Sequence, residues 1–560
     1  MRPDEIIRRI LEIRGIASEE DVREFLSDRP KLTHDPILMP GIKEGAEFLF
    51  RAVSEGKRIC VYGDYDVDGV LGTAALVLFL QSAARSLGSL SEITYYIPSR
   101  LEEGYGLNEG AIRAIKGEGA DVIVTVDCGS VSRDEASYAR EIGLDILITD
   151  HHEPDPLRRP DCIFINPKAE TEGAGYPFRL LSGAGVAFKL CAAIMTLIGG
   201  EDRAFLHELV DLVCVATIAD VMPLTDENRT FVKYGLAKLR KGARPAFLAL
   251  LSVAGVDPGK LSARDVAFVM APRLNALGRL GSASEAVEFI LTDSEDRTKE
   301  IAERMERLNT ERRQIQEDCF RECMELVNAG ACSEEGGKGA GVLLLKPENS
   351  HEGVAGIVAG KVRDATGLPC AVLTEVKDNN GLLKGSARSR ARFDITALLR
   401  RHGELFERLG GHAAAAGFTI EEKNLERLRD ALTEDMTKMI EDDPGLLDDR
   451  EEAELEIGVA DVSEELAEAI ETLAPFGAGN PVPSIAICVP AEELSGVRAM
   501  GHDGKHLRFA ASGIPCVFFG GGGTEFPGSG AVRLTGRPEI NEWNGTRNIQ
   551  FAVEYIDVLQ

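Results

Sequence analysis

Residues 59–71 read ICVYGDYDVDGVL, and this stretch decides the fold. An apolar run of strand length, Ile59–Tyr62, leads directly into a turn rich in aspartate, and a helical pattern, LGTAALVLFL, follows from Leu71. The turn therefore lies at the C-terminal end of a predicted strand. In open α/β sheets this edge is where ligands bind, so the functional site is expected here.

Three carboxylates occupy that turn: Asp64, Asp66 and Asp68. Alternate residues of an extended segment point to the same side, so the three side chains are expected to converge. Carboxylates this close repel one another, and a divalent cation that prefers oxygen ligands, Mg²⁺ or Mn²⁺, would relieve the repulsion. A solvated, Asx-rich turn is the alternative interpretation of the same residues.

Strands and helices alternate along the chain after Lys57. The predicted strands are RICVYGD (58–64), EITYYIP (92–98), DVIVTVD (121–127), DILITD (145–150) and CIFIN (162–166). This alternation predicts a largely parallel sheet with helices on its faces. Residues 1–50 read as short helices, which indicates an adaptor segment rather than a chemical one.

Possible metal ligands also follow other apolar segments. VIVTVD ends at Asp127, ILITD ends at Asp150 before His151 and His152, and the helical run ELVDLVCVATIAD ends at Asp220. Alone, a strand-end aspartate is typical of a turn or a helix cap, and a histidine pair is typical of a surface or a core. Together at one sheet edge, carboxylates and imidazoles favour Mn²⁺ and allow two ions about 3.5–4 Å apart, which suits phosphoryl transfer.

Composition limits the class of protein. A chain of 560 residues with 44% apolar content is an ordinary globular protein with room for about three or four domains. No apolar run reaches transmembrane length and MRPDEIIRRI is no signal peptide, so a cytoplasmic location is expected. The formal net charge of −29 argues against indiscriminate coating of nucleic acid but permits a locally basic groove.

The middle of the chain combines a long helix with glycine-rich segments. A pattern without Pro or Gly over 294–328 predicts a connecting helix, which the loop at 330–341 ends. Strands at 341–347 and 370–376 then flank a helix at 353–367. Two glycine-rich turns are expected next, GSARSRARF (385–393) and GGHAAAAGF (410–418).

The most basic stretch of the chain overlaps these two turns. Seven lysines and arginines lie from Lys384 to Arg408, against three acidic residues. Backbone N–H groups at glycine-rich turns, together with arginines, form a phosphate cradle. The alternative is that the glycines only make turns and the arginines are solvated.

After an acidic stretch at 438–456 the chain becomes rich in strands. PSIAICVP, LRFAAS, PCVFFG, AVRLTGRPE and NIQFAVEYIDV are five predicted strands within about 110 residues, which fits an oligonucleotide-binding (OB) barrel. Such barrels bind single strands with stacked aromatic rings and a basic groove. The candidates are Phe476, His506, Arg508, Phe509 and Trp543, with core packing as the alternative for the aromatic residues.

Four motifs, in this order, resemble those of the DHH phosphoesterase superfamily: GDYDVDG (63–69), TVDCG (125–129), TDHH (149–152) and ATIADVMPL (216–224). Seven further motifs extend the resemblance to RecJ-type single-strand-specific exonucleases, from about residue 45 to the end. They are IPSRLEEGYGLN (97–108), SGAGVAFKL (182–190), APRLNALGRLG (271–281), HEGVAGIVAGK (351–361), GSARS (385–389), GGHAAAAGF (410–418) and PFGAGNP (475–481). Tyr62 stands where some DHH pyrophosphatases have a histidine, which favours the nuclease.

The resemblance implies an α/β fold with several domains. They are a helical segment (1–50), a parallel-sheet DHH catalytic domain (51–245), a connector with the long helix (246–335), a smaller α/β DHH-associated domain that binds substrate (336–440), an acidic linker (441–455) and a five-stranded OB-type β-barrel (456–560).

The resemblance also implies the site residues. Carried over position by position, the metal ligands are Asp66, Asp68, Asp127, His151 and Asp220, holding two Mn²⁺ or Mg²⁺ ions, and Asp64 and His152 complete the catalytic set as support or ligands. Contacts with substrate are implied for Arg279, His351, Ser386, Arg388, Gly411 and His412, and Trp543 is the candidate in the barrel.

The implied activity is 5′→3′ hydrolysis of single-stranded DNA in repair, recombination and replication. In a two-metal mechanism Asp127 bridges the ions and an activated water attacks the terminal phosphodiester. RNA as a substrate and replication or repair proteins as partners stay open, and no membrane is expected. The alternatives are a phosphoesterase for short oligonucleotides or cyclic dinucleotides, and a replisome scaffold with vestigial catalysis.

Overall fold

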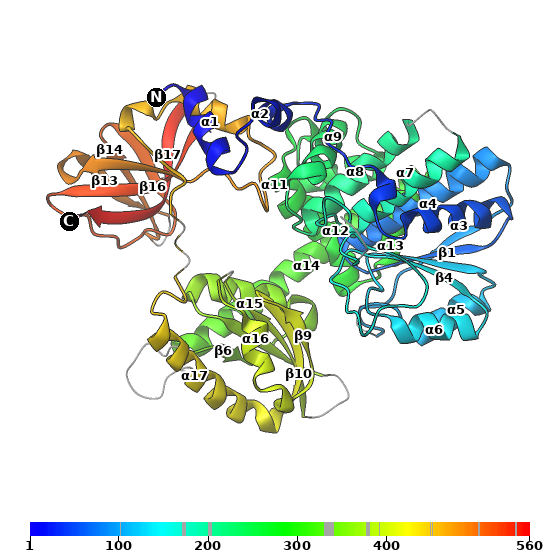
Figure 1. The fold of residues 1–560 in the computed structure, drawn as a ribbon. Coiled ribbons are helices and arrows are strands. Elements are labelled where there is room, and N and C mark those ends of the chain that lie inside the picture. Colours follow the sequence, from blue (N-terminus) through cyan, green and yellow to red (C-terminus); the bar gives the residue numbers. More distant parts are fainter. Residues whose placement is uncertain are drawn as a thin grey trace. The chain divides into compact units, whose positions relative to one another are not determined.

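Figure 1 shows the computed structural model of the chain. It describes all residues except 101, 171–174, 200–203, 330–340, 377–380, 391, 449, 451, 502–503, 544–545 and 560, and it does not describe the side chain of Trp543. The chain divides into two compact units. The first unit comprises Met1–Gly278, Ser282–Glu303 and Glu452–Gln560, and the second comprises Arg279–Gly281 and Arg304–Glu451.

A five-stranded parallel sheet organises the first part of the first unit, in the order β2-β1-β3-β4-β5. Its strands are β1 (Ile59–Gly63), β2 (Ile93–Tyr96), β3 (Val122–Val126), β4 (Asp145–Thr149) and β5 (Ile163–Ile165). The predicted strands and their parallel pairing are confirmed. Every residue of β1 and β3 is buried, as expected where helices cover both faces of a sheet.

Helices cover the two faces of this sheet (Figure 1). On one face lie α5 (Glu109–Gly117) and α6 (Arg133–Glu141), whose alanines and isoleucines share a core with β1, β3 and β4. On the other face lie α3 (Ile42–Ser54), α4 (Val67–Leu87) and α7 (Gly183–Ile198). The α4 helix is long and apolar enough to cross a membrane, but 83% of its most apolar window is buried, as in the core helix of a globular domain.

Further helices extend this part of the first unit. Against α4 packs α8 (Ala204–Ala219), which pairs with α9 (Asp226–Gly242). The chain then forms α10 (Pro245–Ala254), α11 (Ala263–Asp265), α12 (Ala271–Leu280) and α13 (Ser284–Leu291). The predicted long helix is α14 (Glu295–Asn328), which begins in the first unit and continues into the second.

The second unit contains a five-stranded mixed sheet in the order β6-β7-β8-β10-β9. Its strands are β6 (Leu343–Leu345), β7 (Cys370–Glu375), β8 (Leu382–Arg388), β9 (Phe406–His412) and β10 (Ala415–Glu421). One face packs on α15 (Glu352–Thr366) and on α14, and the other packs on α16 (Ile395–Arg400) and α17 (Leu425–Asp442).

The prediction of glycine-rich turns was confirmed for GGHAAAAGF, which contains the turn at 413–414 between β9 and β10, but was wrong for the start of GSARSRARF. GSARS lies largely in β8, and GGHAAAAGF belongs mostly to β9 and β10. The small residues serve close packing instead, since a Cβ on Gly385 would lie 2.1 Å from the ring of Phe418. The predicted loop at 330–341 lies almost wholly outside the described residues.

A seven-stranded sheet forms the C-terminal part of the first unit, in the order β11-β12-β16-β17-β15-β14-β13. The five predicted strands are present as β12 (Ile485–Pro490), β14 (His506–Ala511), β15 (Ile514–Phe518), β16 (Ala531–Trp543) and β17 (Thr546–Leu559). The predicted number was wrong, because β11 (Leu455–Ile457) and β13 (Leu494–Met500) join the two edges of this sheet. β11 has three residues and β13 is almost wholly exposed, so neither shows an apolar pattern.

The N-terminal helix α1 (Pro3–Ile13) packs in the core of this C-terminal sheet. Ile6, Ile7, Ile10 and Leu11 are buried in one cluster with α18 (Glu464–Glu471) and with strands β12 to β17. Between α1 and the parallel sheet the chain forms α2 (Glu19–Leu26), capped by Ser18. The first part of the predicted adaptor segment, through α2, therefore packs with a core built from the other end of the chain, whereas its last part enters α3 beside the parallel sheet.

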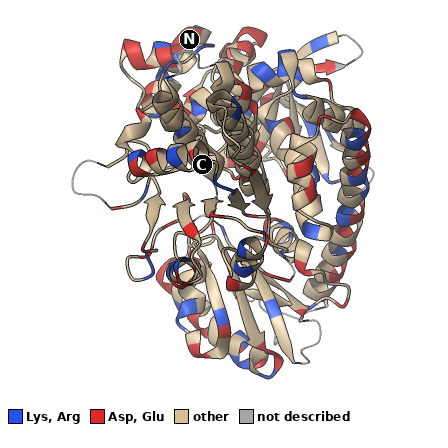
Figure 2. Ribbon diagram, turned by 90° about the vertical axis from the view of Figure 1, so that its right-hand side faces the viewer, with Lys and Arg blue, Asp and Glu red and all other residues tan. Residues whose placement is uncertain are grey.

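Acidic and basic residues alternate along the helices seen in Figure 2, rather than gathering on separate faces in that view. The net charge of −29 is thus spread over many elements. Salt screens exposed charges, so each one acts only over a short distance. Contact with phosphate must therefore depend on nearby groups rather than on the net charge.

A buried ion pair holds the helices behind the parallel sheet together. Lys189 on α7 lies 2.5 Å from Glu227 on α9, and both side chains are almost fully buried. The Tyr176 hydroxyl donates to the same carboxylate at 2.6 Å, and the Lys189 ammonium also donates to the carbonyl of His34 at 2.8 Å. Burial lowers the pKa of Lys189, and the charge of Glu227 partly offsets that effect.

Replacing this lysine is expected to destabilise the first unit. Lys189→Met keeps the apolar stem but leaves the Glu227 carboxylate buried without its counter-charge, so the free energy of unfolding should fall by ~3–5 kcal/mol. Urea denaturation followed by circular dichroism measures the change. The double variant Lys189→Met/Glu227→Gln should recover much of the loss, and a double variant less stable than the single one would contradict this account.

Candidate metal centre

Carboxylates and histidines gather at the C-terminal edge of the parallel sheet. Asp64 directly follows β1, Asp127 directly follows β3, and His151 stands two residues after β4. Asp127 adopts a φ of +63°, which a non-glycine residue seldom adopts, so the backbone turns sharply here. Asp220 directly follows α8. These side chains therefore come from four separate elements.

The aspartates of the GDYDVDG motif do not form the extended row that the sequence predicted. Asp66 is the N-cap of α4 and accepts from the Gly69 N–H at 3.0 Å, and Asp68 lies in the first turn of that helix. The helix starts inside the motif, so the period of two is lost. Asp64 and Asp66 therefore group with Asp127, whereas Asp68 groups with other residues.

Three sets of side chains each bring donor atoms within 4.8 Å of one another. The sets are Asp64, Asp66 and Asp127; Asp68, His151 and Asp220; and Asp127, His151 and His152. Asp127 and His151 each belong to two sets, so the three sets form one continuous cluster. All seven predicted catalytic residues lie in it.

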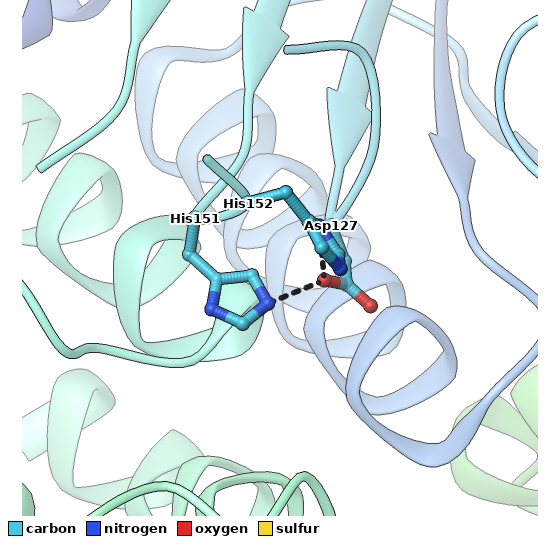
Figure 3. Close-up of side chains that lie close together, drawn as sticks. All are labelled: Asp127, His151 and His152. Carbon is cyan, nitrogen blue, oxygen red and sulfur yellow. Dashed lines mark ion pairs between the residues drawn. The ribbon is translucent and has the colours of Figure 1, made fainter. Parts of the chain in front are cut away.

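The imidazoles of His151 and His152 both approach the carboxylate of Asp127 (Figure 3), and His151 makes further contacts in the cluster. Its Nε2 is 3.0 Å from Asp127 Oδ1, 3.5 Å from Asp220 Oδ2 and 3.8 Å from Asp68 Oδ2. The Nδ1 of His152 lies 3.7 Å from the same Asp127 oxygen. One imidazole nitrogen thus faces three carboxylates.

Several buried atoms of the cluster, including the Asp127 and His151 atoms that lie 3.0 Å apart, have no partner in hydrogen-bond geometry among the described residues. They are Asp64 Oδ1, Asp127 Oδ1, Asp220 Oδ2 and both ring nitrogens of His151. Buried polar atoms are nearly always hydrogen-bonded, so such a concentration needs an explanation. Carboxylate oxygens mixed with imidazole nitrogens are ligands that suit Mn²⁺, and the residues present therefore fit divalent cations.

The pKa values of the cluster show that its buried carboxylates are unfavourable in the charged form. Burial, reinforced by the neighbouring carboxylates, raises the pKa of Asp68 to about 7 and that of Asp220 to about 9. The same two causes hold the pKa of Asp64 and Asp127 well above the ordinary range. Burial lowers the pKa of His151 to about 3. The protein alone thus disfavours the anionic carboxylates, and a cation would favour them.

Asp150 supports the two histidines, a role that the sequence did not reveal. Its carboxylate accepts from the backbone N–H groups of Ser130 at 2.8 Å, His151 at 2.7 Å and His152 at 3.1 Å, and it lies 2.8 Å from the His152 ring nitrogen. Burial alone would raise the pKa of Asp150, but these hydrogen bonds lower it. In turn, burial disfavours the charged His152 ring, but the bond to Asp150 raises the pKa of His152 to about 9.

The N-terminus of α7 holds Asp68. The backbone N–H groups of Gly183 and Ala184 donate to its two carboxylate oxygens at 2.6 Å and 2.9 Å. Helix N-termini favour negative charge, so this placement fixes the orientation of the carboxylate. A Cβ on Gly183 would lie 2.5 Å from the Cβ of Asp127, which explains the glycine. The motif SGAGVAFKL was the signal for this contact.

In the second unit, three of the predicted substrate residues share one face of the sheet. Arg388 on β8 pairs with Ala415 on β10, which pairs with His412 on β9, and Ser386 lies two residues from Arg388 on the same side. Gly411 adjoins His412 with a φ of +147°, and a Cβ there would lie 2.3 Å from the Ala415 oxygen.

The other two predicted substrate residues meet at the start of α15. His351 is the N-cap of this helix and accepts from the Gly353 N–H at 3.0 Å. Arg279 donates to the Gly353 carbonyl at 2.5 Å. The predicted substrate residues of the second unit therefore form two small groups, one on the sheet face and one at the helix start.

Several of the aromatic candidates in the C-terminal sheet pack in or against its core. Phe509 is buried, and Phe476 packs against the same cluster. Arg508 is exposed, and the ring of His506 lies edge-on to that of Phe519, with centroids 5.4 Å apart. Phe519 is 64% exposed and was missed by the sequence analysis. The side chain of Trp543 lies outside the described residues.

Comparisons with known proteins match three successive regions of the chain. Residues 58–217 match the DHH family, N-terminal domain, residues 339–438 match the DHHA1 domain, and residues 453–555 match the RecJ OB domain. The third match confirms the OB class predicted for the C-terminal strands.

Several curated proteins align over almost the whole chain. The chain is 35% identical to the single-stranded-DNA-specific exonuclease RecJ of Bacillus subtilis, over 98% of this chain and 67% of that protein. It is 32% identical to the protein of the same name from Escherichia coli, over 98% of this chain and 95% of that protein.

Solved structures of a RecJ protein match the fold of almost the whole chain. RecJ from Thermus thermophilus in complex with Mn²⁺ matches 99% of this chain and 76% of that chain, with a TM-score of 0.80 and 28% identity. The same protein in complex with Mg²⁺ matches 99% of this chain and 74% of that chain, with a TM-score of 0.73 and 26% identity. With the DHH, DHHA1 and RecJ OB regions in this order, and with relatives of 32–35% identity aligned over 98% of this chain, the chain belongs to the RecJ family.

Proposed function

We propose that this protein is a single-strand-specific 5′→3′ DNA exonuclease that hydrolyses phosphodiester bonds with Mn²⁺ or Mg²⁺. The observation that carries the proposal is the cluster of buried, unsatisfied carboxylate and imidazole atoms at the sheet edge. It occurs in a member of a family whose named relatives are single-stranded-DNA-specific exonucleases.

The proposed metal ligands are the residues of the cluster that the sequence indicated: Asp66, Asp68, Asp127, His151 and Asp220. When bound, two divalent ions supply an activated water and stabilise the leaving oxygen of the phosphodiester. Asp127 belongs to two of the three sets and would therefore help to hold both ions. Asp64 and His152 are proposed to support the ligands or to join them.

The surrounding residues prepare this cluster before any ligand binds. The α7 amides fix the carboxylate of Asp68, and Asp150 fixes the backbone of both histidines and the ring of His152. Hydrogen bonds of this kind to ligand residues orient the donor atoms and typically account for about 10–100-fold in metal affinity or activity.

Phosphate contacts are proposed for the second unit. Ser386, Arg388 and His412 share a sheet face, and glycines at Gly410 and Gly417 leave the backbone beside them open to a strand of nucleic acid. A guanidinium forms bidentate hydrogen bonds with phosphate, which suits Arg388 and Arg279 to this role. His351 and Gly411 complete the proposed set.

Removing the Arg388 guanidinium is expected to weaken binding to single-stranded DNA. The measurement uses an Asp127→Ala background, which is expected to prevent cleavage. In this background Arg388→Ala should weaken binding about 10-fold, by the same factor for different base sequences. The slope of log affinity against log salt concentration should also fall by about 1. Fluorescence anisotropy at several salt concentrations measures both. Arg427→Ala is the control, because Arg427 is exposed on α17 at the opposite face of the sheet. Equal effects of the two substitutions would contradict the assignment.

Two rival functions are less well supported. A phosphoesterase for short oligonucleotides or cyclic dinucleotides needs no OB region, yet this chain matches the RecJ OB domain over 453–555. A replisome scaffold needs no metal ligands, yet the full acidic and histidine set is present and clustered.

Cleavage of end-labelled DNA separates the three functions. Single-stranded and duplex substrates, labelled at either end, would be incubated with Mn²⁺ and with EDTA. Release of mononucleotides from the 5′ end of the single strand, with Mn²⁺ only, is the expected result. Turnover of dinucleotides without attack on long strands would favour the small-substrate enzyme, and binding without cleavage would favour the scaffold.

We further propose a cytoplasmic enzyme that takes part in DNA repair, recombination and replication. We include in this proposal that single-stranded RNA is a second substrate and that replication or repair proteins are partners. The same end-labelled assay with RNA tests the first of these, and co-purification from cells tests the second.

A further inference from the structure

Asp220 is the only one of the proposed ligands carried by a loop between two helices. The segment Asp220–Thr225, here called the Asp220 loop, joins α8 to α9. Val221 has a φ of +57°, and Asp226, just after the loop, has a φ of +48°. A β-branched residue in this region costs roughly 1–3 kcal/mol and persists only where its surroundings hold it. The question is what holds the loop.

A loop from the C-terminal part of the first unit lies directly on the Asp220 loop. Residues Pro475–Pro481, PFGAGNP, are here called the glycine loop. The backbone N–H of Leu224 donates to the carbonyl of Ala478 at 2.7 Å. This hydrogen bond joins the parallel-sheet part of the unit to its OB part, four residues from Asp220.

The glycines of this loop are required by that close approach. A Cβ on Gly479 would lie 2.7 Å from Pro223 Cβ and 3.4 Å from Thr225 Cγ2. A Cβ on Gly477 would lie 2.8 Å from Leu224 Cδ1. A side chain at Gly479 would collide with Pro223 of the Asp220 loop, and a side chain at Gly477 would displace the Leu224 side chain of the same loop.

The glycine loop is itself held rigidly. The buried Asn480 amide donates to the carbonyls of Leu473 at 2.9 Å and Pro475 at 2.8 Å. Its side-chain oxygen accepts from Arg14 at 2.6 Å, and the Arg14 guanidinium also pairs with Glu454 at 2.7 Å. The loop is thus anchored to the OB part and to the end of α1.

A second contact fixes the helix that follows the Asp220 loop. Arg229 on α9 is almost fully buried, and its guanidinium donates to the carbonyls of Ala474 at 2.9 Å and Phe25 at 3.0 Å. Ala474 directly precedes the glycine loop. Both the Asp220 loop and the helix after it are therefore tied to the same short segment of the OB part.

We propose that the glycine loop positions Asp220 for metal binding, so that the OB part of the chain completes the set Asp68, His151 and Asp220. This inference rests on the proposed role of Asp220 as a ligand. Gly477 and Gly479 act through the Asp220 loop and are positioning residues, since neither touches the cluster. The set Asp64, Asp66 and Asp127 contains no residue of the loop and does not depend on the contact.

The test is Mn²⁺ titration of the full chain by calorimetry. Gly479→Ala should lower the affinity of one Mn²⁺ about 10-fold, as expected for loss of support to a ligand, and leave the other unchanged. The matched control is Gly496→Ala. Gly496 has a similar φ of +64°, against +69° for Gly479, but no atom of the described residues lies within 4 Å of its Cβ position. The control therefore carries the same backbone strain without the collision.

A double variant shows whether the effect passes through Asp220. Gly479→Ala should lower Mn²⁺ affinity in the parent but add nothing in an Asp220→Ala background, because the group that it positions is then absent. A general structural effect would weaken binding equally in both backgrounds and would overturn the inference. So would a Gly479→Ala protein with the parent's affinity.

Two further results keep the interpretation unambiguous. If Asp220→Ala alone leaves Mn²⁺ affinity unchanged, the proposed role of Asp220 as a ligand is wrong. If Asp220→Ala lowers Mn²⁺ affinity but Gly479→Ala does not, only the positioning role of the glycine loop is wrong. Should Gly479→Ala lack the parent's cooperative thermal transition, Gly477→Ala replaces it under the same criteria. Among the described residues its Cβ meets the flexible Leu224 side chain, so the fold is expected to persist and the same loss of affinity to be smaller.

Discussion

Asp127→Ala is expected to abolish cleavage of single-stranded DNA, lowering the rate by ~10³-fold or more. Asp127 lies in two of the three donor sets and faces His151 at 3.0 Å, so its loss removes a donor shared across the cluster. Metal ions contribute several kcal/mol to stabilising such a reaction, and about 4 kcal/mol corresponds to ~10³-fold in rate. Affinity for single-stranded DNA should stay largely unchanged, since no residue of the proposed phosphate face is altered.

The control for this prediction is Asp145→Ala, which removes an exposed carboxylate at the start of β4. Its pairing with Lys57 at 3.4 Å is of the surface type that contributes ~0–1 kcal/mol. In addition, Mn²⁺ at a hundred times its dissociation constant should stabilise the parent by about 2.7 kcal/mol and Asp127→Ala much less. An active Asp127→Ala enzyme would show that the cluster is not the metal centre.

Gly183→Ala is expected to lower cleavage by about 10²-fold, although no ionisable group changes. The added Cβ would lie 2.5 Å from Asp127 Cβ and 2.9 Å from its Cα, so either the Asp127 turn or the α7 N-terminus must move. Movement of α7 would also carry away the two N–H groups that hold Asp68. A misplacement of about 1 Å at a reacting site is enough for a 10²-fold loss.

Gly185→Ala provides the comparison two residues along the same helix. Its Cβ would make only an ordinary contact, 3.4 Å from Leu181. Replacing a helical glycine by alanine normally stabilises a helix by about 1 kcal/mol, so this variant should keep its activity and unfold at the same or a higher temperature. Equal loss of activity in both variants would mean that the helix start, rather than the contact with Asp127, is sensitive.

Much of the first unit could be predicted because its strands are short apolar runs that end in polar turns. The runs before Asp64 and Asp127 are buried on both faces, and such strands carry a strong local signal. Parallel strands share one carboxyl edge, so the polar residues after them had to meet. The cluster of seven residues followed from that topology and from the resemblance.

The features that the sequence analysis predicted wrongly or missed depend on contacts between distant segments. Where α4 begins decides whether Asp68 joins Asp64 or Asp220, and the motif itself does not mark that start. Asp150 looks like any other strand-end aspartate until its four hydrogen bonds are seen. In the second unit, the glycines around Gly385 marked ring packing rather than turns, because local composition cannot show what fills the space of a missing Cβ.

The packing of α1 among the C-terminal strands has a consequence for how the chain is made. Ile6 and Ile10 leave the ribosome roughly 450 residues before the strands that bury them, a delay of about 20–90 s at usual rates of synthesis. During that interval the apolar face of α1 lacks the strands that later bury it, and it is exposed to chaperones and to other nascent chains. The OB core can therefore close only after β12 to β17 have been synthesised, long after the helix that they bury.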